Sequence, residues 1–379
     1  MSAIGFMIPL NKADYTSYAS NVGGPRNICA TDPSSWWTNE NIQFTGTVDA
    51  TTARVGDTVV IQVGVQGLTN EGLAAFSVIQ NVQAWVCYPN TVAGGASASL
   101  VVPSMQNNPA SYSDTTDSAF EVEGGGVYED PSFSFHWIPL SSWTPTEDDF
   151  LGQSSHEGHC CVIANAAGFA NYSNMPPNPT PDPIPEGAVI TPDSELSSQI
   201  NICTNPWQGQ RNVAIVAAGA IGGIRANPIF HFLSGAPELE TSSKTTIAVT
   251  AIDQKGQIDP VIFKVLSSGP HARLPLKPAS SPPKSLRLVR HPHERGGWLA
   301  EIIREAEEIV EELLGLDQHK FGGGHKLNLS LPPRGLQPLR LEVELDPTDP
   351  PGAVHAIDIT QTDANGARGG IRVGLVVIP

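Results

Sequence analysis

The sequence predicts a mainly β protein made of two immunoglobulin-like β-sandwiches in tandem. At 379 residues the chain is longer than one ordinary sandwich and fits two domains. It contains 36 Gly and 33 Pro, whereas only 16% of its residues are charged. Such a composition favours short strands joined by turns, because Gly adopts positive φ and Pro fixes φ. Short apolar runs also recur between these turn residues, as in a sandwich.

Residues 1–40 are predicted to form an irregular N-terminal arm. The segment is rich in small and polar residues, contains the turn Gly23-Gly24-Pro25 and has Trp36 and Trp37 near its end. An irregular terminus needs a partner in order to be ordered, so the arm is a candidate for self-association. It could act by donating a strand to the sheet of a neighbouring copy.

The first sandwich is predicted over residues 41–222. Its strands are recognised as alternating or continuously apolar runs rich in β-branched and aromatic residues. They are expected at 42–44, 58–65, 82–88, 132–138, 159–164 and 211–216. The Ser-, Ala-, Asn- and Thr-rich residues 91–118 and the Pro-rich residues 171–195 are predicted to be loops.

The second sandwich is predicted over residues 225–379. Its strands are expected at 230–232, 245–252, 261–265, 326–331, 339–345, 353–360 and 370–377. Residues 269–295 combine Pro and Ser with the main concentration of basic residues in the chain, and they are predicted to be an exposed loop. This basic loop is interpreted as a flexible linker, with a contact to an acidic neighbouring copy as the alternative.

One amphipathic helix, at about 297–314, is expected as an insertion in the second sandwich. Apolar residues from Trp298 to Leu314 recur at spacings of three and four, and Glu residues occupy the opposite face. Gly315 is placed to end the helix. The apolar stripe is expected to pack on the flank of its own sandwich. A partner surface is the alternative.

The charge of −17 is distributed unevenly along the chain. Residues 1–220 contain 4 Lys and Arg against 20 Asp and Glu, whereas residues 221–379 contain 17 against 18. An acidic first half argues against nucleic acid and anionic lipid as partners, because phosphate binding needs clustered cations. The acidic surface is either simply well solvated or suited to cations and basic partners.

All five cysteines lie in the first half of the chain. An odd number leaves at least one free thiol or one bond to another chain. Cys29 and Cys203 both follow Asn-Ile and both precede a polar loop that contains Pro. These two are the best candidates for a disulfide if the compartment is oxidising.

No stretch of the sequence is apolar enough over about 18 to 20 residues to cross a bilayer, so membrane insertion is not expected. The apolar run Met1–Leu10 lacks a preceding basic region, so no signal peptide is recognised. We expect an extracellular location or a place on a cell or particle surface, reached by another route, with the cytoplasm as the alternative.

Candidate metal ligands occur in two places. His156 and His159 have a spacing that can place two ligands on one ion, and Asp346 and Asp349 are loop carboxylates of the kind that bind calcium. Neither pattern matches a defined metal-binding motif, so no cofactor is expected, with calcium as the alternative.

No catalytic residues are predicted, and the chain is not expected to be an enzyme. The sequence has no Gly-x-Ser-x-Gly elbow, and its Gly-rich turns lack the Lys and Ser/Thr of a phosphate-binding loop. Cysteines on buried strands are usually inert.

Three tryptophans in loops suggest a different function. Trp36, Trp37 and Trp207 could stack on sugar rings if their faces are exposed. The sequence therefore keeps open a carbohydrate-binding or adhesion module that uses these residues.

The order of features in the first half resembles bacterial immunoglobulin-like domains of the CARDB (cell-adhesion-related) type. The resemblance rests on the strands Val59–Val65 and Val82–Tyr88, the Trp143-Thr-Pro145 motif, Gly158–Ala164, and Asn201 followed by Gln210–Val213. In the second half, Leu341–Leu345, Pro350–Gly352, Ile357–Gln361 and Gly369–Val373 look like a fibronectin-type-III or related sandwich. The long loops at 91–118 and 171–195 and the inserted helix depart from these patterns.

The resemblance implies adhesion, display or spacer roles in bacterial and phage surface assemblies. The expected function is a non-catalytic structural or interaction protein that could self-assemble through its arm. Its expected partners are proteins or further copies of itself, with a glycan as the alternative.

Overall fold

The structure is a computed structural model of the chain. It describes residues 5–20, 26–32, 35–47, 51–68, 76–91, 100–114, 120–123, 128–130, 134–150, 157–171, 184–191, 199–221, 224–225, 228–235, 243–267, 270–290, 324–333 and 335–379. The helix predicted at 297–314 and His156 lie outside these residues.

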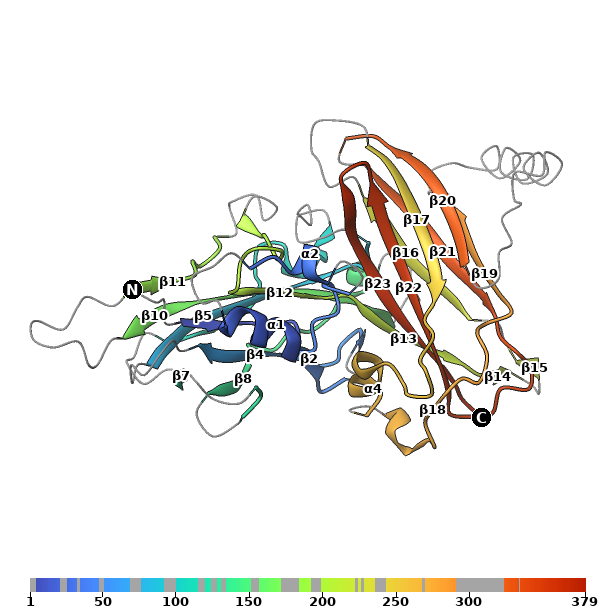
Figure 1. Ribbon diagram of the computed structural model, residues 1–379, viewed down its shortest axis with the longest axis horizontal. Helices are drawn as coiled ribbons and strands as arrows, with labels where there is room; N and C mark the ends of the chain where they lie inside the picture. Colours follow the sequence, from blue (N-terminus) through green and yellow to red (C-terminus); the bar gives the residue numbers. More distant parts are fainter. Residues whose placement is uncertain are drawn as a thin grey trace, which may run out of the picture.

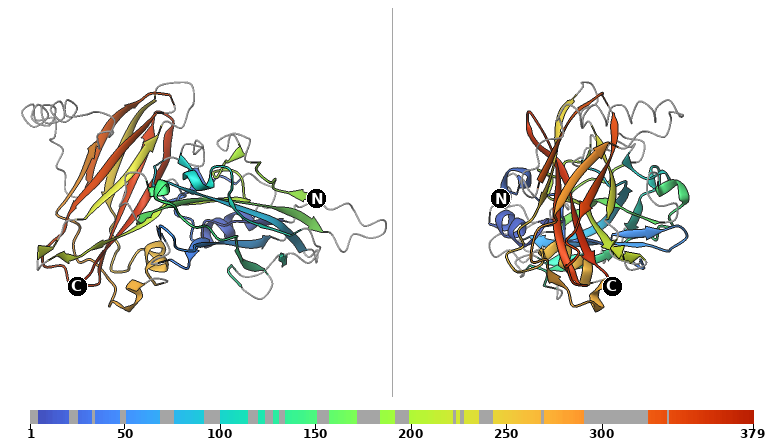
Figure 2. Two further views of the ribbon diagram at one scale, coloured as in Figure 1. Left: turned by 180° about the vertical axis from the view of Figure 1, so that it is seen from behind. Right: turned by 90° about the vertical axis from the view of Figure 1, so that its right-hand side faces the viewer.

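The chain forms two β-sandwiches that lie side by side, so the predicted mainly β fold is confirmed (Figures 1 and 2). In Figure 1 the long strands of the first sandwich run along the molecule and those of the second cross them at a steep angle. None of the helices in the described part of the chain is long and apolar enough to span a membrane.

The first sandwich packs two sheets around one apolar core. One sheet contains β1 (Gly5–Met7), β2 (Ile42–Thr45), β4 (Val60–Leu68) and β8 (Phe135–Pro139). The other contains β5 (Phe76–Cys87), β6 (Ala110–Ser113), β7 (Phe120–Glu123), β10 (Cys161–Asn171), β11 (Ile184–Glu186) and β12 (Gln208–Arg211). A separate pair joins β3 (Thr52–Arg54) to β9 (Glu157–His159). On β4 the alternating Ile61, Val63 and Val65 point into the core.

The expected irregular arm is instead an integral part of the first sandwich. β1 pairs antiparallel with β4 of the same chain, and Phe6, Ile8 and Leu10 lie in the core. Helix α1 (Lys12–Ala19) follows, with the side chain of Asn11 capping its first turn. A buried ion pair between Arg26 and Asp14, with Nη2 and Oδ2 2.6 Å apart, fixes the chain after α1. The prediction was wrong because the alternation of Phe6, Ile8 and Leu10 is a strand signal.

The second sandwich also has two sheets around a core. The larger contains β13 (Val213–Ala218), β17 (Ser243–Ala251), β18 (Lys277–Pro278), β20 (Gly324–Leu331), β22 (Ala353–Asp363) and β23 (Gly366–Val377). The smaller contains β16 (Ile229–Gly235), β19 (Ser285–Arg290) and β21 (Leu336–Glu344). A short hairpin joins β14 (Ala220–Ile221) to β15 (Ile224–Arg225).

The predicted strand at 261–265 is a helix, α4 (Pro260–Ser267). The side chain of Asp259 accepts hydrogen bonds from the backbone N–H groups of Val261 and Ile262, which caps a helix that begins with Pro. The apolar run that suggested a strand buries Ile262, Val265 and Leu266 against the outer face of the larger sheet. A short apolar run does not distinguish the two kinds of element.

All three predicted loops also contain regular structure, and in the Pro-rich loop 171–195 it is β11 at residues 184–186. Residues 270–290 of the predicted basic loop form a 3-10 turn η4 (Pro270–Arg273), then β18 and β19. Between residues 100 and 114 lie a 3-10 turn η2 (Pro103–Met105) and β6. The remaining short helices in the described residues are α2 (Ile28–Thr31) and η3 (Glu147–Phe150).

The chain passes from the first sandwich to the second at Asn212, within the single strand predicted at 211–216. β12 pairs with β10 of the first sandwich, whereas β13 pairs in parallel with β23 of the second. Only Asn212 separates the two strands. So short a connection leaves little freedom between the domains.

Candidate functional site

Trp36 and Trp37 are core residues, so they offer no ring face to a sugar. Their exposed fractions are 1% and 0%, and their rings pack edge to face with the ring centroids 5.5 Å apart. Trp207 is half-buried and packs on the first core. The expectation that Trp36 and Trp37 lie on a loop surface was wrong, because the segment carrying them folds between the two sandwiches.

Cys29 and Cys203 form a disulfide, with their Cα atoms 5.2 Å apart. It ties α2 to the chain that leads into β12. Cys87, Cys160 and Cys161 are buried and do not form disulfides among the described residues. Burial raises the pKa of Cys87 well above its usual value and that of Cys161 to about 12, so both thiols stay protonated and unreactive at neutral pH.

Of the predicted metal ligands, His159 and Asp346 have protein groups as hydrogen-bond partners. His159 lies with its Nδ1 3.3 Å from the hydroxyl of Thr52, and its ring packs edge-on against Phe230. The Asp346 carboxylate accepts hydrogen bonds from Thr348. Within the described ranges, no three His, Cys, Asp or Glu side chains are placed to hold a metal ion.

A buried polar network joins the two sandwiches around Asn212. Its backbone N–H donates to the carbonyl of Trp37 at 2.7 Å, and its side-chain amide donates to the carbonyls of Asn90 and Gly370 at 3.1 Å each. A Cβ on Gly370 would lie 2.5 Å from the indole ring of Trp37, so the strand and the ring can approach this closely only with Gly.

A second part of the joint centres on Gln361 of β22, which is completely buried. The hydroxyls of Thr91 and Ser234 donate to its side-chain carbonyl at 2.6 and 2.9 Å, and its amide donates to the carbonyl of Gly235 at 2.8 Å. Thr91 belongs to the first sandwich, and the other three residues belong to the second. Both polar atoms of the Gln361 side chain are thus hydrogen-bonded, and its carbonyl oxygen joins the loop after β5 to the second sandwich.

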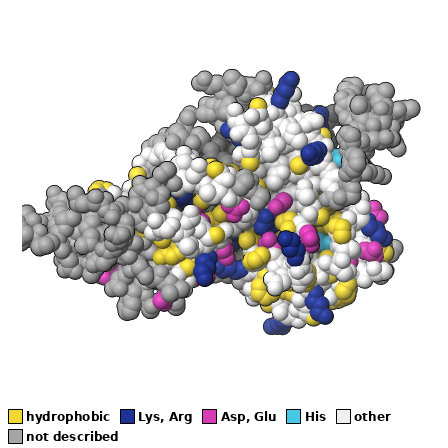
Figure 3. All heavy atoms as spheres, viewed as in Figure 1, with side chains coloured by type: hydrophobic (Ala, Val, Ile, Leu, Met, Phe, Trp, Pro, Cys, Tyr) yellow, Lys and Arg dark blue, Asp and Glu magenta, His cyan; other side chains and the backbone are white. Residues whose placement is uncertain are grey.

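The rim of the joint is charged. Lys264 on α4 lies 2.8 Å from the Glu129 carboxylate and 3.9 Å from that of Glu40, both in the first sandwich. Its ammonium also lies 5.6 Å from the centre of the Trp137 ring. In Figure 3 acidic and basic side chains are interspersed over the described part of this face.

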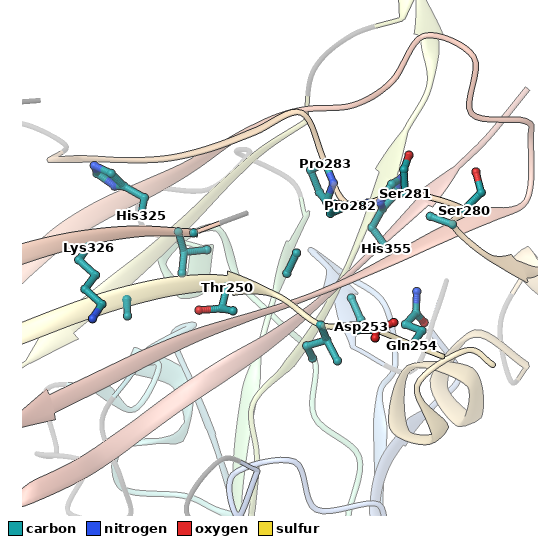
Figure 4. Close-up of a pocket in the computed structure, with 17 residues that line it drawn as sticks. Thr250, Asp253, Gln254, Ser280, Ser281, Pro282, Pro283, His325, Lys326 and His355 are labelled. Atoms are coloured by element: carbon teal, nitrogen blue, oxygen red, sulfur yellow. The ribbon is translucent and has the colours of Figure 1, made fainter. Parts of the chain in front are cut away.

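A cavity of about 760 Å³ lies at one edge of the second sandwich. It opens where the chain leaves the larger sheet after β17 and where residues 279–283 cross towards β19. Val249 and Ala251 of β17 contribute apolar wall, together with Pro283. Figure 4 shows polar residues at both ends: Asp253, Gln254, Ser280, Ser281 and His355 at one, His325 and Lys326 at the other.

His355 and Asp349 form a buried pair beside this cavity. Their side chains are 2% and 3% exposed, and Nε2 of His355 lies 3.0 Å from Oδ2 of Asp349. Burial lowers the pKa of His355 below its usual value, although the Asp349 carboxylate acts in the opposite direction. The imidazole is therefore neutral at neutral pH.

Sequence reasoning placed Asp349 among calcium ligands and missed His355. The signal was present, because His355 occupies an inward position of β22 between Ala353 and Ile357. A polar side chain in such a position must find a partner. The sequence also placed the expected function in the first sandwich and its arm, whereas this cavity belongs to the second sandwich.

No protein-family model matches the sequence, and neither does any curated protein. Among solved structures, a collagen adhesin (CNA) from S. aureus is 7% identical, with a TM-score of 0.20 and coverage of 94% of this chain and 96% of that one. The CupB6 tip adhesin from Pseudomonas aeruginosa is 11% identical, with a TM-score of 0.15 and coverage of 89% and 97%.

Proposed function

We propose that the chain is a non-catalytic structural or interaction protein, a tandem sandwich subunit of a bacterial or phage surface or particle assembly. In this role the two sandwiches act as one stiff body that presents surfaces at a fixed relative orientation. The joint at Asn212 and Gln361 carries the proposal. The CARDB-type resemblance of the first half, with the display and spacer roles that it implies, supports it.

The joint favours a stiff body because its contacts are buried and polar. The Asn212 amide bonds to main-chain carbonyls of both sandwiches, and the Thr91 hydroxyl of the first sandwich bonds to the Gln361 side chain of the second. Opening the joint would leave these buried donors and acceptors unsatisfied. A tandem pair joined by a flexible linker would not need a buried residue such as Gln361 at this place. The proposal does not include exchange of the N-terminal arm between copies, since β1 pairs within its own chain.

The test is a distance measurement between the two sandwiches in solution. Spin labels would be attached to cysteines introduced at the exposed positions Glu121 on β7 and Ser330 on β20. Pulsed electron paramagnetic resonance is expected to give one narrow distance distribution at both low and high salt, since the main contacts are buried. The control is the parent chain without the two introduced cysteines. It should take up no spin label, because its own Cys87, Cys160 and Cys161 are buried.

A broad distribution, or one that widens strongly with salt, would contradict the proposed stiff role. It would mean that the charged rim around Lys264 holds the sandwiches together and that the buried network does not.

A further inference from the structure

The cavity of the second sandwich has the size and the lining of a small-molecule site. Its volume of about 760 Å³ lies within the range of roughly 300–1,000 Å³ that is usual for ligand pockets. Buried Val249 and Pro283 and half-buried Ala251 give it apolar walls. The hydroxyls of the exposed Ser280 and Ser281 lie at its rim, beside His355 (Figure 4).

His355 is the polar group that is buried against this space. An ionised carboxylate only accepts hydrogen bonds, so the 3.0 Å contact with Asp349 places the proton on Nε2 of the imidazole. Nδ1 then carries a lone pair. His355 lines the cavity. Asp349 does not line it and contacts the His355 ring on its Nε2 side.

The neutral imidazole of His355 and the apolar walls beside it disfavour a charged head group at this position, although Asp253 lies at the same end of the cavity. The imidazole is neutral, so it offers no attraction to an anion. A charged group would also lose its hydration against Val249, Ala251 and Pro283, which cannot replace it. A neutral hydrogen-bond donor loses less hydration free energy than a charged group and gains Nδ1 of His355 as an acceptor.

We propose that this cavity binds a small uncharged organic molecule with an apolar body and a hydroxyl group, which donates its hydrogen to Nδ1 of His355. The apolar body lies against Val249, Ala251 and Pro283. Further hydroxyls of the ligand would meet Ser280 and Ser281. The inference does not depend on the stiffness of the joint, because the cavity is formed by the second sandwich alone.

Three probes with one shape and different head groups test this chemistry on the full chain. They are 1-adamantanol, 1-adamantanecarboxylate and 1-adamantylammonium, and their binding would be titrated by saturation-transfer difference NMR. We expect saturable binding of the alcohol, at least fivefold tighter than that of either charged probe.

Two variants locate the binding. Ala251→Leu fills the cavity and is expected to abolish binding of the alcohol, whereas Ala272→Leu, at an exposed position outside the cavity, is expected to leave it unchanged. His355→Phe combined with Asp349→Asn keeps an aromatic ring and removes the acceptor without leaving a buried charge unpaired. It is expected to weaken alcohol binding at least fivefold.

Three results would overturn the proposal: no saturable binding of the alcohol, binding of a charged probe as tight as that of the alcohol, or binding that Ala251→Leu leaves intact. Should the double variant fail to fold, Ala251→Leu and the probe series decide the question.

Discussion

At the scale of single residues, the polar groups that matter lie inside the protein. Glu186 at the end of β11 is 6% exposed, and its carboxyl lies near the hydroxyl of Ser77 at 3.5 Å. Burial raises the pKa of Glu186 to about 8, although hydrogen bonds from the Phe6 backbone and from Ser77 act in the opposite direction. The carboxyl is therefore mostly protonated at neutral pH in the folded state.

The pKa of Glu186 predicts that the protein loses stability as the pH rises. Between about pH 4.5 and 8 the unfolded carboxyl releases its proton while the folded one keeps it, so the free energy of unfolding decreases with pH. The pKa shift corresponds to a loss on the order of 5 kcal/mol, which is complete above about pH 8. Glu186→Gln keeps the shape without the charge and should remove this decrease.

Urea unfolding at a series of pH values measures the effect. Glu121→Gln, which removes one exposed carboxylate from β7, is the matched control and should keep the decrease seen in the parent protein. A parent protein whose stability is flat over this pH range would show that Glu186 does not retain its proton.

At the scale of elements, the central strands could be predicted because each buries an apolar pattern. Residues 353–360 and 370–377 lie within β22 and β23, and 58–65 overlaps β4. The failures involved short elements whose state depends on the rest of the molecule. The apolar residues of α4 fit a strand equally well. The split at Asn212 could not be predicted, because it depends on β12 and β13 pairing with strands of different sandwiches.

The disulfide illustrates what local sequence context can indicate. The matching Asn-Ile-Cys contexts singled out Cys29 and Cys203, although they are separated by 174 residues. The same reasoning could not show that the arm is ordered, because that depends on β4 being available to pair with β1. The candidate cavity was also beyond prediction, since residues 249–254, 279–283, 324–326 and 355 meet only in the folded protein.

Reduction of the Cys29–Cys203 bond is expected to destabilise the first sandwich. Its loop of 174 residues predicts a loss of about 3 to 5 kcal/mol, because the unfolded chain regains conformational freedom. Calorimetry with and without dithiothreitol would show a lower Tm for the reduced protein. The variant Cys29→Ala with Cys203→Ala should have the same low Tm in both buffers, and a Tm of this variant that still responds to dithiothreitol would contradict the assignment.

At the scale of the whole molecule, the joint makes the two sandwiches one mechanical unit. Their cores are separate, but the segment carrying Trp37, the loop at Asn90 and Thr91, and Asn212 lie between them. The side chains in the networks around Asn212 and Gln361 are polar, so no apolar pattern in the sequence marks their positions as buried. For this reason the sequence could predict two sandwiches and could not predict how they are held.

Gln361→Ala tests whether the joint couples the unfolding of the two sandwiches. The variant leaves the hydroxyls of Thr91 and Ser234 and the carbonyl of Gly235 without their buried partner, at a cost of about 2 to 4 kcal/mol. In the parent protein we expect one calorimetric transition whose van't Hoff and calorimetric enthalpies agree. In the variant the transition should broaden or split, because Thr91 loses its bond to Gln361 and is left with its hydrogen bonds to Leu233 as a link to the second sandwich. Gln337→Ala removes a half-buried Gln of β21 that bonds to the neighbouring Pro338, and it should leave a single transition. Two transitions in the parent protein would mean that the sandwiches unfold independently and that the buried network only orients them.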